Sequence, residues 1–439
     1  MHDVSALNDA SRRIEECADA SRLRDLICGV VDANERWRGR QCLNLVAAES
    51  PTSNLVRKLL SSEVGIRASG GHIGRQNRFF VGMDFVDELE AICIQMLKRL
   101  LHSKFADHRL LGGMISCLVA YTSLTDIGDR IMSVPVHLGG DTSNRANGPP
   151  GVRGLEVVDL PFDPNSCSVD LNRLYEIGRK LRPRVVGIGM TIALFPFPIR
   201  EIRAIVDSWG GYIYFDAAHQ LGLISGEQFP NPLDEGADVL TGSTGKTFSG
   251  PQGGAIFTNN AVLAQRITDT IFPVLTGSHQ INRVAALALA AAEQLAYGKE
   301  YMKQVVLNAR HLASSLEKRD IRVLHAERGY TETHQLMIDA APYGGGEAVV
   351  RRLEQANIIT NKMPLPQDGR DEHVHESGVR LGTVEVTRLG MKEPEMDRIA
   401  EMIASSIQLA KPCERLRREI IDFRSNYNTL FYCHDHPSP

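Results

Sequence analysis

Apolar residues along the chain follow two alternating periods, one typical of strands and one typical of helices. From about residue 110 onward, β-branched runs such as RIMSV, LEVVDL, RVVGIGM and YIYFDAAH predict strands, and the stretches DLNRLYEIGRKL and IREIRAIVDSWG between them predict amphipathic helices. Strands that alternate with helices indicate an α/β fold with a mostly parallel sheet covered on both faces. Such sheets bind ligands at the carboxyl ends of their strands, so polar residues at those ends are the first candidates for a site.

The pattern differs on both sides of this region. Residues 9–36 and 84–101 predict helices, and long Ala/Leu-rich helical text begins after about residue 280. That text leads into a smaller α+β region, which includes IRVLHA, HQLMIDA and VRLGT and a final helix near 393–410. We therefore expect a helical N-terminal arm at 1–55, a large domain at 56–295 and a small C-terminal α+β domain at 296–439.

Composition excludes several classes of protein. The 439 residues include 49 Lys and Arg against 53 Asp and Glu, and a net charge of −4 gives no reason to expect nucleic acid or an anionic membrane as a partner. No apolar run approaches the roughly 20 residues of a membrane helix, and the first residues lack the apolar core of a signal peptide. The eight cysteines are scattered without a CxxC pair, which predicts reduced thiols in the cytoplasm, no disulfide framework and no metal site.

Three features of the large domain carry candidate chemistry. The predicted strand YIYFDAAHQLG ends on Asp216 and His219, the loop GSTGKTFSGPQGG contains Lys246, and a Gly112–Gly113 turn precedes a helical stretch. Each feature is weak alone, and the text GSTGKT resembles the end of a phosphate-binding P-loop. A P-loop needs a glycine five residues before Gly245, where this chain has Leu240.

Together the three features fit pyridoxal phosphate (PLP) chemistry. PLP needs a lysine for its Schiff base and a carboxylate that keeps its pyridine nitrogen protonated, so that the ring acts as an electron sink. Its phosphate needs backbone N–H groups, preferably at a helix N-terminus. Lys246, Asp216 and the upstream Gly112–Gly113 turn supply these three parts.

The amino-acid sequence around these features resembles serine hydroxymethyltransferase and its relatives among the fold-type I PLP-dependent transferases. The resemblance covers roughly residues 43–410. It is strongest along DAAHQLGLISGEQFPNPLDEGADVLTGSTGKTFSGPQGGAIF, and it includes AAESPTSNLV, GDRIMSV, IFPVLTG, TETHQLMID and SGVRLGTVEVTRLGMKE. The family implies a mostly parallel sheet of the seven-stranded type in the large domain. It also implies a homodimer or dimer of dimers in which the segment around residues 272–278 reaches the phosphate of the neighbouring subunit.

The resemblance assigns roles to individual positions. Lys246 would carry the Schiff base, Asp216 would pair with the pyridine nitrogen, and Arg380 would grip the substrate carboxylate with its bidentate guanidinium. The remaining expected cofactor and substrate contacts come from Gly112, Gly113, Asp141, Thr191, His219, Ser243 and Gly277, with Glu49 on the substrate side.

Several positions depart from the family pattern, and they affect the substrate more than the cofactor. The family's proton-handling glutamate falls at His72, which could still perform acid–base work, and two tyrosines become Phe79 and Phe80. A ring-stacking histidine becomes Asp141. The other changed positions are Ala48, Gly70, Met114, Gly245 and Gln252.

These departures weaken the case for tetrahydrofolate as a co-substrate. We expect a PLP enzyme that makes or breaks the Cα–Cβ bond of a β-hydroxy-α-amino acid through a quinonoid intermediate. Gln252 and the text TETHQL look more like the L-threonine transaldolase branch, and a methylserine-type hydroxymethyltransferase is an alternative. Racemase, decarboxylase or aminotransferase chemistry on the same scaffold, or PLP binding without catalysis, also remain open, because the electron sink does not choose the bond that breaks.

Overall fold

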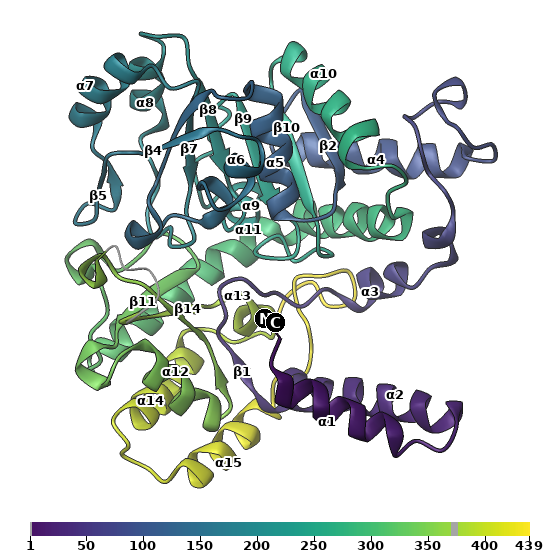
Figure 1. Cartoon of the computed structure of the whole chain (residues 1–439). Helices are drawn as coiled ribbons and strands as arrows, with labels where there is room; N and C mark the ends of the chain where they lie inside the picture. Colours follow the sequence, from purple (N-terminus) through teal and green to yellow (C-terminus); the bar gives the residue numbers. More distant parts are fainter. Residues whose placement is uncertain (1, 370–375) are drawn as a thin grey trace.

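The centre of the protein is a seven-stranded sheet. The computed structural model describes residues 2–369 and 376–439, and the strand order is β2-β10-β9-β8-β7-β3-β4 (Figure 1). In that order the strands are Phe105–Leu110, Gly254–Thr258, Val239–Ser243, Tyr212–Asp216, Val185–Gly189, Arg130–Ser133 and Glu156–Asp159. Only β10 runs antiparallel to its neighbours within this sheet. The predicted mostly parallel sheet is therefore confirmed.

Helices cover both faces of this sheet, which is why its central strands are buried and mostly apolar. One face packs on α5 (Gly113–Leu124) and α10 (Ala261–Asp269). The other packs on α4 (Asp84–Leu100), α7 (Leu171–Leu181), α8 (Ile199–Val206), α9 (Leu221–Ser225) and the first part of α11 (Ile281–Glu317). Every residue of β7, β9 and β10 is buried, as expected for strands enclosed by two helical layers.

The 37-residue helix α11 links the two halves of the molecule. Its buried residues join the core of the large sheet up to Val306 and a second core from Ala309 onward. It therefore runs without interruption through the boundary expected at 295–296. The division into an arm, a large domain and a small domain stays a prediction.

The second core surrounds a small antiparallel sheet of order β11-β14-β13, which consists of Gln335–Asp339, Gly378–Gly382 and Asn361–Met363. The helices α12 (Gly346–Gln355), α13 (Val384–Arg388), α14 (Glu393–Ile407) and α15 (Cys413–Arg424) accompany it. The sequence predicted a last helix near 393–410, and the structure places α15 after it. Shorter elements are α3 (Asn54–Leu60), α6 (Pro149–Val152) and the hairpin β5 (Phe162–Asp163) and β6 (Ser168–Val169).

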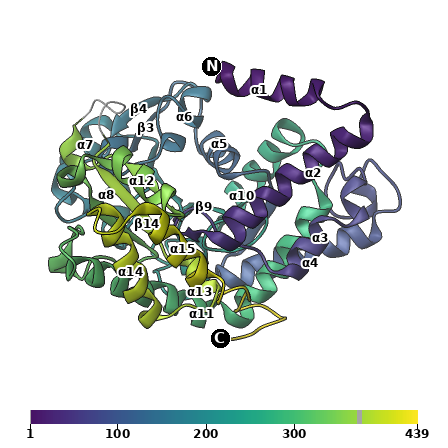
Figure 2. The ribbon, with the colours of Figure 1, turned by 90° about the horizontal axis from the view of Figure 1, so that it is seen from below.

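The N-terminal helices α1 (Val4–Glu15) and α2 (Ala20–Arg36) have no buried residue. The helical stretch expected at 9–36 is split in two because the side chain of Asp19 accepts from the amide of Arg22 and so begins a new helix. Seen from below, α2 crosses in front of the molecule and α1 lies along its edge (Figure 2). After them, β1 (Leu43–Asn44) pairs with β12 (Ile358–Ile359) of the C-terminal half.

Across the described residues, every helix is too short or too polar to span a bilayer. All eight cysteines are free. The expected cytoplasmic location stays a prediction.

Candidate active site around Lys246

The candidate residues lie at the carboxyl ends of adjacent parallel strands. Asp216 and Ser243 end β8 and β9, and the Gly112–Gly113 turn follows β2. Thr191 follows β7, and Asp141 follows β3. The fold therefore gathers, at one edge of the sheet, side chains that the sequence spreads over more than a hundred residues.

Asp216 is a buried carboxylate that already holds several donors. Its Oδ2 accepts from Asn144 Nδ2 at 3.2 Å, from Cys117 Sγ at 3.3 Å and from Ser143 Oγ at 3.4 Å. Burial raises the pKa of Asp216 and the charge of Asp141 adds to this, whereas Lys246 and the hydrogen bonds lower it. The carboxylate is thus fixed in orientation and electrostatically coupled to Lys246.

Lys246 lies in the tight loop between β9 and β10. Its carbonyl accepts from the amide of Ser249 at 2.9 Å. The hydroxyl of Thr247 donates to the carbonyl of His219 at 2.8 Å and accepts from the amide of Gly222. Burial lowers the pKa of Lys246, and the charges of Asp216 and Asp141 oppose that shift. The loop is therefore anchored to the segment that follows β8, and its amine is electrostatically coupled to two carboxylates.

Arg380, on β14, reaches this site from the small sheet. Its guanidinium donates to the carbonyl of Thr191 at 2.7 Å and to Asn361 Oδ1 at 3.2 Å, and it lies 3.3 Å from His219 Nε2. Only 5% of Arg380 is exposed. Within the described part of the chain it forms no ion pair, and burial lowers its pKa to about 10. A buried cation without a carboxylate partner is ready to receive an anionic ligand.

His219 stacks on a second buried histidine that the sequence analysis did not single out. The rings of His219 and His334 lie 5.6 Å apart at 20°, and His334 Nε2 lies 3.1 Å from the carbonyl oxygen of Ala47. Burial, followed by the charges of Lys246 and Arg380, lowers the pKa of His219 well below its usual value. His219 is therefore a neutral ring between the lysine loop and the small sheet.

Hydrogen bonds from neighbouring residues fix the carboxylate of Asp141, which stands where the family has a ring-stacking histidine. Its carboxylate accepts from the hydroxyl of Thr191 and from the amide of Ser143 at 2.8 Å. Although burial opposes the effect, these hydrogen bonds lower the pKa of Asp141. Asp141 thus stays ionised and adds a second negative charge near Lys246.

The Gly112–Gly113 turn and Ser243 form a cradle at the N-terminus of α5. A Cβ atom built on Gly113 would lie 2.8 Å from Ser243 Oγ, so the glycine lets the hydroxyl approach the first turn of the helix. No side chain caps α5. The free N–H groups of such a terminus bind phosphate or carboxylate groups.

Three of the expected site residues lie outside this cluster. His72 lies beside Arg109 Nη1, at 3.4 Å, and its ring packs edge-on against Phe272. Gly277 is exposed on the segment before α11. Their expected roles stay predictions.

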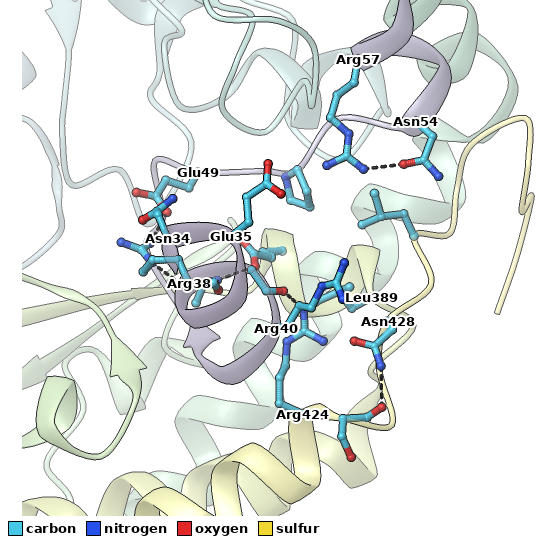
Figure 3. Close-up of a pocket in the computed structure, with 16 residues that line it drawn as sticks. Asn34, Glu35, Arg38, Arg40, Glu49, Asn54, Arg57, Leu389, Arg424 and Asn428 are labelled. Carbon is cyan, nitrogen blue, oxygen red and sulfur yellow. Dashed lines mark hydrogen bonds and ion pairs between the residues drawn. The ribbon is translucent and has the colours of Figure 1, made fainter. Parts of the chain in front are cut away.

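Glu49 is the third of these residues, and it lines a groove of about 1030 Å³ between α2 and the C-terminal helices (Figure 3). Its carboxylate lies 2.7 Å from Arg38 Nη2 and is 46% exposed. The next residue, Ser50, does reach the Lys246 loop, because its Oγ lies 2.6 Å from Ser249 Oγ. Substrate binding by Glu49 stays a prediction.

Sequence reasoning missed several residues of this site. Cys117 lies on helix α5, Asn144 in a short 3-10 turn and Asn361 on β13 (Asn361–Met363), and only the fold brings them to Asp216 and Arg380. His334 had a signal, because it belongs to the quoted run TETHQLMID. Gly245 and Gln252, two of the positions that differ from the family pattern, are neighbours in the structure. A Cβ on Gly245 would lie 2.8 Å from the side chain of Gln252.

Comparisons with known proteins agree with this geometry. A sequence model of the family described as "Serine hydroxymethyltransferase" matches residues 25–403. The serine hydroxymethyltransferase of Archaeoglobus fulgidus is 40% identical over 396 residues, which cover 90% of each chain. That of Methanocella arvoryzae is 39% identical over 409 residues, covering 92% of this chain and 96% of the relative.

A solved structure shares the fold. The crystal structure of L-threonine transaldolase from Pseudomonas fluorescens in internal aldimine state superimposes with a TM-score of 0.86 at 24% identity, and the match covers 98% of this chain and 96% of that one. The architecture is therefore that of the fold-type I PLP-dependent enzymes.

Proposed function

Because the chain belongs to the serine hydroxymethyltransferase family of PLP-dependent enzymes, we propose that it makes or breaks the Cα–Cβ bond of a β-hydroxy-α-amino acid at Lys246. The observation that carries this proposal is that the Lys246 loop, Asp216 and Arg380 converge: Thr247 donates to the carbonyl of His219, and His219 Nε2 lies 3.3 Å from Arg380. The charges of Asp216 and Asp141 act on the Lys246 amine. Arg380 lies at the same place and has no anionic partner among the described side chains.

The residues present fit PLP. The cradle of Gly112, Gly113 and Ser243 at the free start of α5 suits its phosphate, and buried Asp216 suits its ring nitrogen. Lys246 would hold the cofactor covalently. Bound PLP supplies an electron sink for the electrons of the broken Cα–Cβ bond.

The side chains of this chain would prepare the reaction. Burial of Lys246 enlarges the fraction of its amine that is neutral, and the neutral amine is the nucleophile and proton acceptor. Arg380 would bind the substrate carboxylate by a two-pronged contact, while the carbonyl of Thr191 and Asn361 fix its guanidinium. This orientation determines which bond at Cα is activated, and its contribution to the rate is largely entropic.

The changed residues suggest an acceptor other than tetrahydrofolate. His72 stands where the family's proton-handling glutamate is expected, and burial followed by the charge of Arg109 lowers its pKa. It would therefore be a neutral proton acceptor near pH 7. Phe79 and Phe80 cannot donate the hydrogen bonds of the expected tyrosines. We propose aldehyde transfer or aldol cleavage without folate, as a threonine transaldolase performs it.

A product assay with the PLP-loaded protein tests the proposal. L-Serine, L-threonine and α-methylserine are each incubated with and without tetrahydrofolate, and aldehyde release and amino-acid products are measured. We expect acetaldehyde from threonine at a rate that tetrahydrofolate does not change. Formation of keto acids without any aldehyde would instead show aminotransferase chemistry, and strict folate dependence would restore the hydroxymethyltransferase reaction.

A second copy of this chain is the proposed partner. Apolar side chains stand exposed on the 66–92 region and beside it, with Phe79 77%, Val81 99%, Phe85 81% and Val274 69% exposed. Several large apolar side chains exposed close together on one surface are typical of an interaction site. They flank His72 and Gly277, which the chain leaves outside its own Lys246 cluster. We propose a homodimer in which these two segments complete the site of the partner subunit.

Phe85→Glu is expected to shift the protein from dimer to monomer in analytical ultracentrifugation, because the charge would be desolvated in the interface. The monomer should have little activity, since its site would lack the segments of the partner. Ile127→Glu is the matched control, because Ile127 is 78% exposed but lies before β3, at the opposite end of the strands. A monomeric wild-type protein, or a fully active monomeric variant, would contradict the shared site.

A further inference from the structure

A second group of ionisable residues is buried away from Lys246. Glu90 on α4, His108 on β2 and His279 before α11 place one ligand atom each within 4.8 Å of one another. His108 Nε2 lies 3.7 Å from Glu90 Oε1, and His279 Nε2 contacts the same oxygen. The three side chains are at most 2% exposed.

His108 is the unusual member of this group. Neither of its ring nitrogens has a hydrogen-bond partner among the described residues, although the ring is buried. A buried polar group without a partner costs roughly 1–3 kcal/mol. An imidazole nitrogen is a common ligand of metal ions in proteins, and His108 Nε2 lies 3.7 Å from Glu90 Oε1. A cation next to Nε2 would satisfy this nitrogen.

The surrounding groups orient the other two side chains. Arg78 donates to Glu90 Oε2, which leaves Oε1 facing the two imidazoles. His279 Nδ1 lies 3.5 Å from Ser69 Oγ. Partners of this kind, behind the ligand atoms, fix the orientation of ligands in known metal sites.

Three arginines lie around the group, and two of them, Arg78 and Arg109, are paired with carboxylates. Arg78 lies 2.8 Å from Asp87, and Arg109 lies 2.6 Å from Asp107. Arg283 is buried nearby and donates to the carbonyl of His108. Glu90 itself contacts Arg78 through Oε2 and His279 through Oε1.

We propose that Glu90, His108 and His279 bind one divalent transition-metal ion, with Zn²⁺ as the best fit. Two imidazoles and one carboxylate are a frequent zinc ligand set, with a water in the fourth position. None of the site's ligands belongs to the Lys246 cluster, so metal binding can be tested separately from the proposed reaction. Its three ligands come from separate elements, so the ion would hold α4, β2 and the start of α11 together.

The ion would also steady the two segments that we assign to the partner's site. Ser69 and Arg78 flank the loop that carries His72, and Arg78 Nη1 donates to the carbonyl of Ser69 at 2.7 Å. The amide of His279 donates to Ser69 Oγ at 3.1 Å. Glu90 and His279 are thereby connected to both the 69–78 loop and the segment that contains Gly277.

Zn²⁺ titration of the chelator-treated, PLP-loaded protein tests the site. Competition with a chromophoric chelator should reveal one tight site per chain, and Zn²⁺ should raise the Tm of the wild type. We expect His108→Gln to weaken Zn²⁺ binding by at least about 100-fold and to abolish the Tm increase. His311→Gln is the matched control, because His311 also faces a carboxylate, Asp397 at 3.1 Å, outside the group; it should bind Zn²⁺ as the wild type does.

Wild-type crystals grown with Zn²⁺ provide a readout that needs no variant. An anomalous-difference peak between the three side chains, at the zinc absorption edge, is the expected result. If the density shows no peak there, or if His108→Gln binds Zn²⁺ as tightly as the wild type, the three residues form an internal hydrogen-bonding network only, and the proposal is wrong.

Discussion

Replacing Lys246 by alanine is expected to abolish the covalent attachment of PLP and to lower kcat by about a thousandfold or more, because the variant loses both the attachment point and a positioned proton acceptor. The Lys246 amine is electrostatically coupled to Asp216 and Asp141. The fold should survive, since the loop is fixed through its backbone and through Thr247 and not through the amine.

Two measurements separate this role from a structural one. The first is the visible absorption of the dialysed protein, which should disappear in Lys246→Ala while the far-UV circular dichroism stays unchanged. The second is the rate of aldehyde release from threonine. Lys299→Ala is the control, because Lys299 is 69% exposed and pairs with Glu227 on the surface. A Lys246→Ala protein that keeps its absorption and its activity would disprove the assignment of the cofactor lysine.

Replacing Arg380 by alanine is expected to lower kcat/KM about 100-fold, mainly through KM. Loss of one partner of a buried, hydrogen-bonded charge pair costs roughly 2–5 kcal/mol, and about 3 kcal/mol corresponds to a factor of about 100. Arg380→Lys should restore little of this, because an ammonium group cannot form the two parallel contacts of a guanidinium. The positive charge of the lysine alone would thus not be sufficient to bind the substrate carboxylate as the wild type does.

A substrate comparison assigns the effect to the carboxylate. The wild type should prefer L-threonine strongly over L-threonine amide, and this preference should largely disappear in Arg380→Ala. Arg322→Ala is the matched control on the same small domain, since the Arg322 guanidinium is 69% exposed and lies 3.2 Å from Asp339. If Arg380→Ala discriminates between acid and amide as the wild type does, Arg380 has no role in carboxylate binding and serves the packing of β14 against Thr191.

Most of the large-domain architecture was predictable from the sequence. The runs RIMSV, RVVGIGM and YIYFDAAH contain β3, β7 and β8, because strands buried on both faces must be apolar throughout. Helix α4 begins where the amphipathic text begins, at Asp84. The N-terminal helices were harder to predict, because one continuous helical pattern corresponds to two helices in the structure. The second helix begins at a cap formed by Asp19, and the hydrophobic periodicity of the sequence does not indicate such a cap.

Some features of the candidate site were likewise predictable from the sequence, and others were not. The spacing of Asp216, Lys246 and the Gly112–Gly113 turn was enough to indicate PLP chemistry, because each requirement of the cofactor corresponds to a residue type near a strand end. The contacts of Asp141 were not predictable, since its carboxylate finds Thr191 only after β3 and β7 pair side by side. Likewise, the sequence does not indicate that Asn144 and Cys117 both donate to the same oxygen of Asp216.

The sequence by itself thus determined the fold class, the lysine and carboxylate at the centre of the site, and the positions where this chain departs from its family. These depend on residue type and local periodicity, which are properties of the chain alone. Only the tertiary structure decided that Arg380 is buried without a carboxylate partner among the residues described, that His72 and Gly277 lie outside the Lys246 cluster, and that Glu90, His108 and His279 converge. Those facts depend on distances between segments far apart in the chain, which packing fixes and which no local pattern encodes.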